Sequence, residues 1–217
     1  IVSEPSNPWV SGVAGLFSGE FYRHIQHHLH DDGLFVQWIQ LYEINVDLVV
    51  SVLKAVAANF SDFAVYATNG GDMVIIAAKN GLLREPDYSL LKTPGISGAL
   101  RRIHIENEQD IDIRKIGSKR FLGTLLASYP IRANSDYHPV LDQNAARSRF
   151  LEESARELAG FSHMPVPTLE MLDPPAFPRE ATNVSPSSYL EKAQEASTAM
   201  GLRDYFRTGS FGSGTIR

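Results

Sequence analysis

The sequence has no cysteine, no long apolar run and no excess of positive charge, and each absence excludes a class of protein. Without cysteine, the 217 residues form no disulfide, thiolate nucleophile or thiolate metal site, although this assigns no redox compartment. No apolar run approaches the roughly 18 to 20 residues that span a bilayer, and the start lacks the pattern of a signal peptide. A formal net charge of -5 provides no basic stripe for a phosphate backbone, so we expect no nucleic acid partner.

Hydrophobic residues make up 43% of the chain, which is enough to build a core. From Ile1 to Lys79, short apolar runs alternate with helical periodicity, and this predicts an α/β domain with a mostly parallel sheet. Asn69-Gly70-Gly71 predicts a hairpin turn, so the last strand should run antiparallel to its partner. We expect strands at 1–3, 34–42, 63–68 and 72–78, and helices at 12–30 and 45–60, the latter capped by Asn45.

After Lys79 the β-branched runs stop and the pattern predicts short helices, at 87–92, 96–103, 118–128 and 143–160. Ile1 is not a start methionine, and Ile1-Val2 has the pattern of a strand already in progress, so we expect the chain to begin inside a domain. The predicted division is a domain over 1–79, a helical extension over 80–163, a proline-rich linker over 164–186, a terminal helix over 187–207 and a disordered tail over 208–217.

The segment richest in chemistry is Glu4-Pro5-Ser6-Asn7-Pro8-Trp9, between a predicted strand and a predicted helix. In open parallel sheets, ligands bind beyond the carboxyl ends of the strands, so a carboxylate at Glu4 would face that crevice. The two prolines stiffen the loop and fix where Glu4 and Asn7 project. The spacing is equally compatible with a surface acid before a helix, and both interpretations stay open.

A group of histidines offers ligands for a metal ion. His24 and His28 lie one helical turn apart, and Glu20 lies one turn earlier on the same face. Metal centres normally need more well-placed ligands than this, and His⁺ near a helix C-terminus is favourable without a metal. We therefore interpret these residues as a solvated helix face and assign no metal.

Two further groups have structural alternatives of the same kind. Trp9 and Trp38 have enough aromatic area to stack on a ligand, but aromatic residues at strand ends are typical of a partly buried core. Asp136 and His138 could form a catalytic dyad, yet no nucleophile is near them in sequence. The alternative for this stretch is a capped turn before the helix from Gln143.

Several segments together form a recognisable pattern: Glu4-Pro5-Ser6-Asn7-Pro8-Trp9, Leu16-Phe17, Glu20-Phe21-Tyr22, Asp32-Gly33, Gln37–Tyr42 and Asn134–Pro139. This pattern resembles the polyamine aminopropyltransferases, the spermidine synthase family. The likeness covers about residues 1–79 and is closest to bacterial spermidine-synthase-like proteins that are often fused to membrane segments. It implies the C-terminal half of a methyltransferase-like Rossmann domain, with four strands of which the last is antiparallel, followed by an α-helical extension.

The resemblance implies transfer of an aminopropyl group from decarboxylated S-adenosylmethionine to an amine. Glu4 takes the place of the acid that accepts the amine proton or orients the amine. The family's second acid falls on Asn7, whose neutral amide cannot supply a charge-assisted hydrogen bond. The enclosing Tyr-Pro-Ser-Gly loop of the family corresponds to the shorter Tyr66–Gly71. The implied substrate-binding residues are Asn7, Trp9, Tyr22, Gln40 and Tyr66.

The resemblance also places the family's glycine-rich loop and its ribose-binding and adenine-binding acids upstream of Ile1. We therefore expect this chain alone to be inactive and to bind neither decarboxylated S-adenosylmethionine nor S-adenosylmethionine. Two alternatives stay open, an S-adenosylmethionine-dependent methyltransferase and a non-catalytic interaction module on the same fold. The expected partners are a small amine and further copies of the chain, and the expected location is the cytoplasmic side of the inner membrane, with any tether in upstream segments.

Overall fold

The computed structural model describes residues 1–163, so the predictions for 164–217 lie outside the described residues. The chain divides into two compact units. Unit 1 consists of Ile1–Arg84 and Ile116–Phe161, whereas Glu85–Lys115 belong to unit 2. This division differs from the predicted boundary at Lys79, because residues 116–161 fold back onto the first domain.

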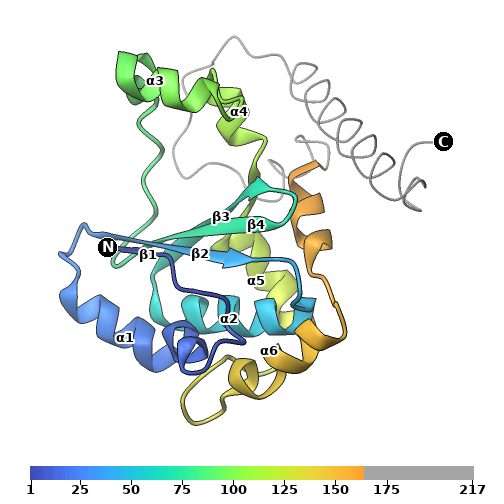
Figure 1. The fold of residues 1–217 in the computed structure, drawn as a ribbon. Coiled ribbons are helices and arrows are strands. Elements are labelled where there is room, and N and C mark those ends of the chain that lie inside the picture. The colour runs from blue at the N-terminus through green and yellow to red at the C-terminus, as the bar shows by residue number, and fades with distance from the viewer. Residues whose placement is uncertain (164–217) are drawn as a thin grey trace, which may run out of the picture. The chain divides into compact units, whose positions relative to one another are not determined.

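An open, five-stranded mixed sheet runs through unit 1 in the order β1-β2-β4-β3-β5 (Figure 1). Strands β1 and β2 are parallel, and β4 lies antiparallel between β2 and β3. The α/β class and the antiparallel hairpin are thus confirmed, whereas β5 was not predicted. The strands are β1 (Val2–Ser3), β2 (Leu34–Gln40), β3 (Asp62–Asn69), β4 (Asp72–Ala78) and β5 (Lys115–Ser118).

The helices of unit 1 lie on one face of this sheet (Figure 1). They are η1 (Val13–Phe17), a short 3-10 helix, and α1 (Gly19–His28), α2 (Val46–Asn59), α5 (Lys119–Ser128) and α6 (Val140–Phe150). The predicted helix 12–30 is divided at Ser18, whose hydroxyl accepts the Phe21 N–H at 3.2 Å and caps α1. Asn45 caps α2 as predicted, accepting the Leu48 N–H at 3.0 Å.

The predicted helix 143–160 is wrong at both ends. Helix α6 begins earlier, at Val140, and ends at Phe150. Glu152 follows with a φ of 53°, a left-handed conformation that no α-helix continues through. The chain then forms a separate 3-10 helix, η3 (Arg156–His163). This break turns the segment after α6 back toward the sheet, where it matters for the candidate site.

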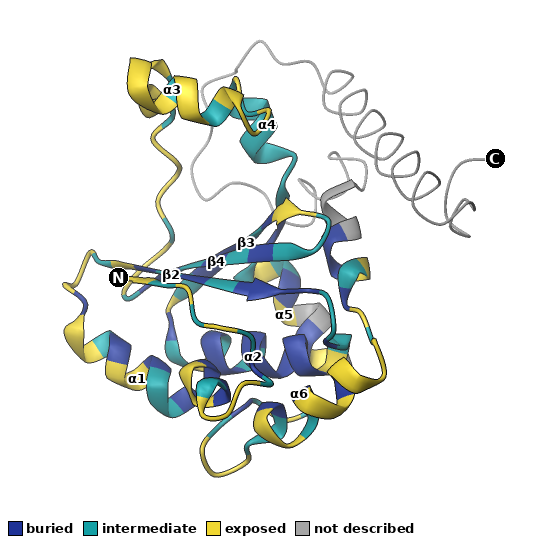
Figure 2. Ribbon diagram, in the orientation of Figure 1, coloured by how far each residue is buried: buried dark blue, intermediate teal, exposed yellow. Residues whose placement is uncertain are grey.

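The core lies between the sheet and α2, and Figure 2 shows it as the buried inner face of the helices. Phe35 of β2 stacks on Phe60 with ring centroids 5.5 Å apart, and Tyr22 of α1 meets Phe35 edge-on at 5.9 Å. Full burial of one such side chain contributes about 1.5 to 3 kcal/mol. The turn from α1 to β2 requires glycine at Gly33, because a Cβ there would lie 2.9 Å from the carbonyl oxygen of His30.

Unit 2, over Glu85–Lys115, is built from short helical segments: η2 (Tyr88–Lys92), α3 (Pro94–Arg101) and α4 (Glu108–Asp112). Asp87 caps η2 by accepting the Ser89 N–H at 3.0 Å. Asn107 and Asp110 form a capping box at the start of α4. The sequence predicted the first two helices but not α4, because five residues are too few to show a helical repeat.

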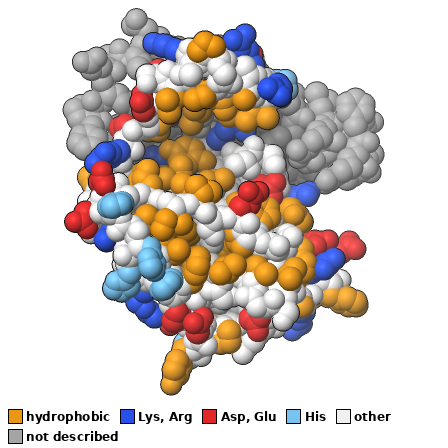
Figure 3. All heavy atoms as spheres, turned by 60° about the vertical axis from the view of Figure 1, so that its left-hand side comes forward, with side chains coloured by type: hydrophobic (Ala, Val, Ile, Leu, Met, Phe, Trp, Pro, Cys, Tyr) orange, Lys and Arg blue, Asp and Glu red, His pale blue; other side chains and the backbone are white. Residues whose placement is uncertain are grey.

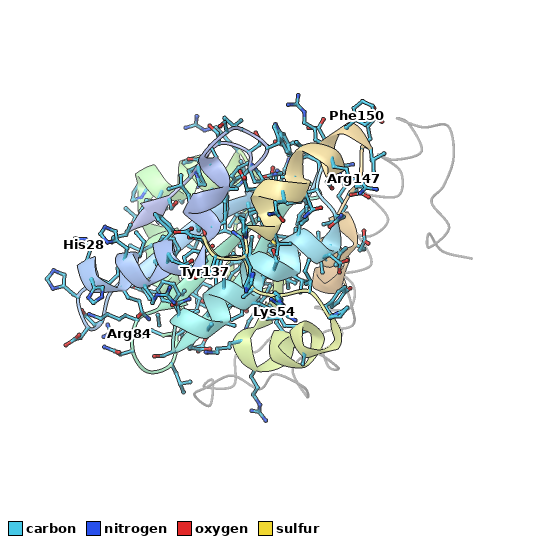
Figure 4. All side chains as sticks on the ribbon, turned by 90° about the horizontal axis from the view of Figure 1, so that it is seen from below. His28, Lys54, Arg84, Tyr137, Arg147 and Phe150 are labelled. Atoms are coloured by element: carbon cyan, nitrogen blue, oxygen red, sulfur yellow. The ribbon has the colours of Figure 1, made fainter. Side chains whose placement is uncertain are left out.

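Polar contacts hold residues 129–141 against α2. The Lys54 ammonium donates to the carbonyl oxygens of Tyr129 and Ile131 at 2.7 and 2.8 Å. Lys54 lies on α2 and is labelled in Figure 4, which views the molecule from below. Two charge-assisted hydrogen bonds from one ammonium fix the path of this connection. The connection leads directly into Asn134.

Asn134 is 2% exposed and is the central residue of this connection. Its amide group donates to the carbonyl oxygen of Phe17 at 3.0 Å and accepts the Leu141 N–H at 3.1 Å. Its backbone N–H donates to Ser51, and its carbonyl oxygen accepts the Gly19 N–H, both at 3.0 Å. The side chain and the backbone of Asn134 thus join η1, α1, α2 and α6.

Replacing Asn134 with alanine is expected to lower the free energy of unfolding by about 2 to 4 kcal/mol, because buried partners lose their hydrogen bonds. Urea denaturation followed by circular dichroism measures this loss. The control is Gln143→Ala, at an exposed position of α6, which should change stability by less than about 0.5 kcal/mol. Equal effects of the two substitutions would contradict the central role of Asn134.

Candidate functional site

The carboxyl ends of β1, β2 and β3 meet at one edge of the sheet. Strands β1 and β2 are parallel, and both β2 and β3 run antiparallel to β4. The Glu4–Trp9 loop follows β1, Tyr42 follows β2, and the Asn69–Gly71 turn follows β3. Ligands of open α/β sheets bind at this edge, so it is the candidate functional site.

The Glu4–Trp9 loop is fixed by Tyr42. The Asn7 amide donates to the Tyr42 hydroxyl at 3.2 Å, and the Trp9 ring meets the Tyr42 ring edge-on at 6.3 Å. Glu4 is exposed. The structure therefore brings Asn7 and Trp9 to the same tyrosine, which the sequence did not single out, and leaves the Glu4 carboxylate in solvent at the strand end.

Arg149 of α6 reinforces this arrangement. Its guanidinium lies 5.0 Å from the centre of the Trp9 ring, a cation–π contact. Its Nε lies 3.4 Å from a carboxylate oxygen of Glu43. Glu43 has a φ of 54°, a conformation that costs of order 1 kcal/mol or more for a residue other than glycine. Arg149 thus stabilises both the aromatic pair and the strained residue beside Tyr42.

Gln40 ends β2 on the sheet face opposite α2. Its side chain is completely buried, and neither its amide nitrogen nor its amide oxygen has a hydrogen-bond partner. Asp72 of β4 lies directly opposite Gln40 in the pairing of β2 with β4, so the two side chains are on the same face of the sheet. One carboxylate oxygen of Asp72 accepts from the Asn69 amide at 2.7 Å, whereas Oδ1 is buried and unpartnered.

Arg156 of η3 lies beside the hairpin turn that precedes Asp72. A Cβ on Gly71 would lie 3.8 Å from Arg156 Nη2 and 3.6 Å from Tyr42 Cδ1, so both side chains lie close to this turn. The Nε of Arg156 is also buried without a partner. We call Gln40, Asp72 and Arg156 the polar cluster. Sequence reasoning proposed Gln40 but gave no signal for Asp72 or Arg156, because only the pairing of β2 with β4 places Asp72 opposite Gln40, and only the turn after α6 places Arg156 beside Gly71.

Two predicted substrate-binding residues lie away from Glu4. Tyr22 is completely buried beneath the other face of the sheet, and its hydroxyl donates to Gln37 Oε1 at 2.6 Å. Burial raises the pKa of Tyr22 well above its ordinary value. The structure thus makes Tyr22 a core residue with no surface for a substrate. Tyr66 is half-buried on β3 and lies opposite Val74 of β4. Val74 follows Asp72 on the same face of β4, farther from the hairpin turn.

The histidines of α1 form an exposed group, drawn in pale blue in Figure 3. His24 and His28 have ring centroids 4.6 Å apart. Glu20, which shares their face, instead bonds Arg23 and the backbone N–H of Asp136, both at 2.8 Å. Within residues 1–163, no group of three or more His, Asp or Glu side chains is arranged to hold a metal ion.

The Asp136 and His138 turn is held by structural contacts. The backbone N–H of Asp136 bonds Glu20, and the backbone N–H of His138 donates to the Ser135 hydroxyl at 2.9 Å. The His138 Nε2 lies 3.2 Å from a guanidinium nitrogen of Arg132. These contacts favour the capped turn over the catalytic dyad, although the helix that follows begins at Val140 rather than Gln143.

A cavity of about 280 Å³ in unit 1 lies at the opposite edge of the sheet, where β2 begins and β4 ends. The charged residues that line it form ion pairs. Asp31 pairs with Lys79 at 3.3 Å, and Asp32 pairs with Arg84 at 3.8 Å. This cavity is not at the carboxyl ends of the parallel strands, and its charges are already compensated.

The hydrogen bond from Asp136 to Glu20 predicts a pH-dependent contribution to stability. It is the main cause that lowers the pKa of Glu20 below its ordinary 4.5. A carboxyl group with a lowered pKa in the folded state adds stability above about pH 4.5, and this contribution is lost as the pH falls further. Because the side chain is 35% exposed, we expect less than about 1 kcal/mol.

Glu20→Gln should therefore be less stable than the native protein at pH 7, and the two should converge near pH 3. Urea denaturation at both pH values measures the difference. Glu152→Gln, a change at an exposed acid, is the control. A Glu20→Gln deficit that is the same at both pH values would show that the carboxylate charge does not contribute.

No protein-family model, no curated protein and no solved structure matches this chain. In the described residues, no helix has the length and apolar character to cross a membrane. The candidate site therefore stands on its own geometry: a free carboxylate, a fixed aromatic pair and a buried polar cluster at one sheet edge.

Proposed function

We propose that this chain provides the acceptor side of an aminopropyltransferase-like site, in which Glu4 takes the proton from a primary amine. One observation carries the proposal: Glu4 stands free directly after β1, in a loop that Tyr42 fixes, at the edge where the parallel strands end. The antiparallel β4 between β2 and β3 supports the implied methyltransferase-like half-domain. The resemblance of residues 1–79 to spermidine synthases supports the same assignment.

The proposed reaction requires the protein to orient the two substrates and to supply one base. The amine nitrogen attacks the carbon beside the sulfonium of decarboxylated S-adenosylmethionine, a C–N bond forms, and the C–S bond breaks to release a thioether. The proton leaves the amine for the Glu4 carboxylate. The sequence contains no Gly-x-Gly-x-x-Gly turn after a strand, so the proposal assigns the amine, and not the adenosyl group, to this chain.

Asn7 has a positioning role in this proposal. Its amide N–H₂ already donates to Tyr42, and an amide carries no charge to bind an ammonium group. Its contribution is to hold the loop, with Trp9 packed on the same tyrosine. The aromatic pair then forms an apolar wall for the carbon chain of the acceptor, and Glu4 and the polar cluster supply the charges.

Glu4→Gln should weaken binding of putrescine to the 217-residue chain by about tenfold, because a charge-assisted contact becomes a neutral one. Titration calorimetry at pH 7 measures this change. Glu152→Gln, an equivalent change at another exposed acid, should leave the affinity unchanged. The same titration with decarboxylated S-adenosylmethionine and S-adenosylmethionine should show no binding. Amine binding that does not depend on Glu4, or micromolar binding of either adenosyl compound, would overturn this assignment.

A non-catalytic interaction module is a second candidate, favoured by the free edge of the sheet at β1. The helices of unit 1 that are described cover one face, while Val36, Trp38 and Ile76 on the other face are only half-buried. The free edge of β1 adds Val2, which is 78% exposed. Unpaired edges and apolar faces favour association with other chains, so we propose that copies of this chain self-associate through β1.

Val2→Lys should reduce this self-association, because a lysine on an edge strand opposes pairing with another strand. Sedimentation velocity over a hundredfold range of concentration compares it with the native chain. The control is Leu82→Lys, which adds the same charge at a site that is 60% exposed and outside the sheet. A native chain that stays monomeric throughout would contradict the proposal.

A further inference from the structure

The sequence contains two Asn-Gly pairs, Asn69-Gly70 and Asn80-Gly81. Such a pair is prone to a reaction with itself, because glycine has no Cβ to shield its backbone nitrogen from the preceding side chain. The glycine nitrogen attacks Cγ of the asparagine, a C–N bond forms, and the side-chain nitrogen leaves as ammonia. Water then opens the cyclic imide to aspartate or isoaspartate. In a folded chain, the rate depends on how firmly the asparagine amide is held.

The amide of Asn69 is held at both of its ends. Its Oδ1 accepts the Gly71 N–H and its Nδ2 donates to Asp72 Oδ2, both at 2.7 Å. The backbone of Asn69 also pairs with Asp72 in the ladder between β3 and β4. To bring Cγ within bonding distance of the Gly70 nitrogen, the amide has to leave both partners. The hairpin turn therefore protects this asparagine.

The amide of Asn80 is held much less firmly. Asn80 is exposed in the bend that follows β4. Its amide nitrogen lies 3.4 Å from two oxygen atoms of Asp31, beyond the usual range of a hydrogen bond. Within residues 1–163, neither its amide oxygen nor the Gly81 N–H has a hydrogen-bond partner. A Cβ on Gly81 would meet no atom within 4 Å, so the surroundings leave room for the reaction.

We propose that Asn80 is a site of spontaneous deamidation in the folded chain, while Asn69 keeps its amide. Water is the only co-reactant, and only the two long contacts to Asp31 are given up. The site lies at the end of β4, at the sheet edge opposite Glu4. The inference is thus independent of the proposed function.

The modification changes the charge of the cavity in unit 1. Asn80 lines this cavity together with Asp31, Asp32 and Arg84. The product places a third carboxylate there, next to Asp31, and like charges at this distance repel. The whole chain, whose formal net charge is -5, gains one further negative charge. Anion-exchange chromatography should therefore separate the modified chain from the original.

The test is a time course of the 217-residue chain at mildly alkaline pH, followed by tryptic digestion and mass spectrometry. The tryptic peptides 55–79 and 80–84 carry Asn69 and Asn80 separately. Asn80 should convert at least about tenfold faster, because Asn69 must first lose two hydrogen bonds. The same time course in concentrated urea is the control. There the two asparagines should react at similar rates, because the hydrogen bonds of the fold are gone.

A variant tests the protection of Asn69 directly. Asp72→Ala removes the acceptor of its amide nitrogen, so it should raise the rate at Asn69 and leave the rate at Asn80 unchanged. An unchanged rate at Asn69 would contradict the protection. Equal rates in the folded chain, or no reaction at either asparagine where urea allows both, overturn the proposal. A difference that persists in urea also overturns it, because local sequence and not the fold would then determine the rates.

Discussion

The arrangement of unit 1 depends on the buried amide of Asn134. A single side chain there satisfies groups on η1 and α6, while its peptide unit satisfies α1 and α2. Without these bonds, several backbone groups would be buried and unpaired, so the connection can adopt only this path. The path places Arg149 over Trp9 and starts η3 beside Gly71. The candidate site is therefore assembled by a residue on the opposite side of the sheet.

The same edge of the sheet combines a rigid part and an unsatisfied part. The rigid part is the aromatic pair of Trp9 and Tyr42, fixed by Arg149 and by the Asn7 hydrogen bond. The unsatisfied part is the polar cluster, which is buried without internal pairing. A rigid wall beside unpaired charges is how a binding site is preorganised, since the protein has bonds to offer without first breaking its own.

The proposed function combines the expected resemblance to spermidine synthases with the geometry of the sheet edge. The resemblance assigns Glu4 as the base and leaves an amide at Asn7 where the family has a second acid. The structure places another carboxylate, Asp72, at the same edge, together with an arginine.

The sequence by itself determined the local elements of this protein. Alternating apolar runs and turn residues predicted β2, β3 and β4, the hairpin at Asn69–Gly71 and the cap at Asn45, because these depend on neighbouring residues. It also identified Glu4, Asn7, Trp9 and Gln40 at the ends of strands. Its failures were short or interrupted elements, such as β5, α4 and the helix that stops at Phe150, where a few residues show no period.

Only the tertiary structure decided which residues meet. Tyr22 and Gln40 looked alike as polar residues near strands. Tyr22 of α1 is a core residue that bonds Gln37 on one face of β2, whereas Gln40 lies on the other face, because a strand presents alternate residues to opposite faces. Arg156 lies far from Gly71 in sequence, and no local pattern links them. Their meeting depends on the antiparallel insertion of β4 and on the return of the chain after α6, both of which are long-range packing choices. The sequence therefore determined the strand ends, and tertiary packing determined the site between them.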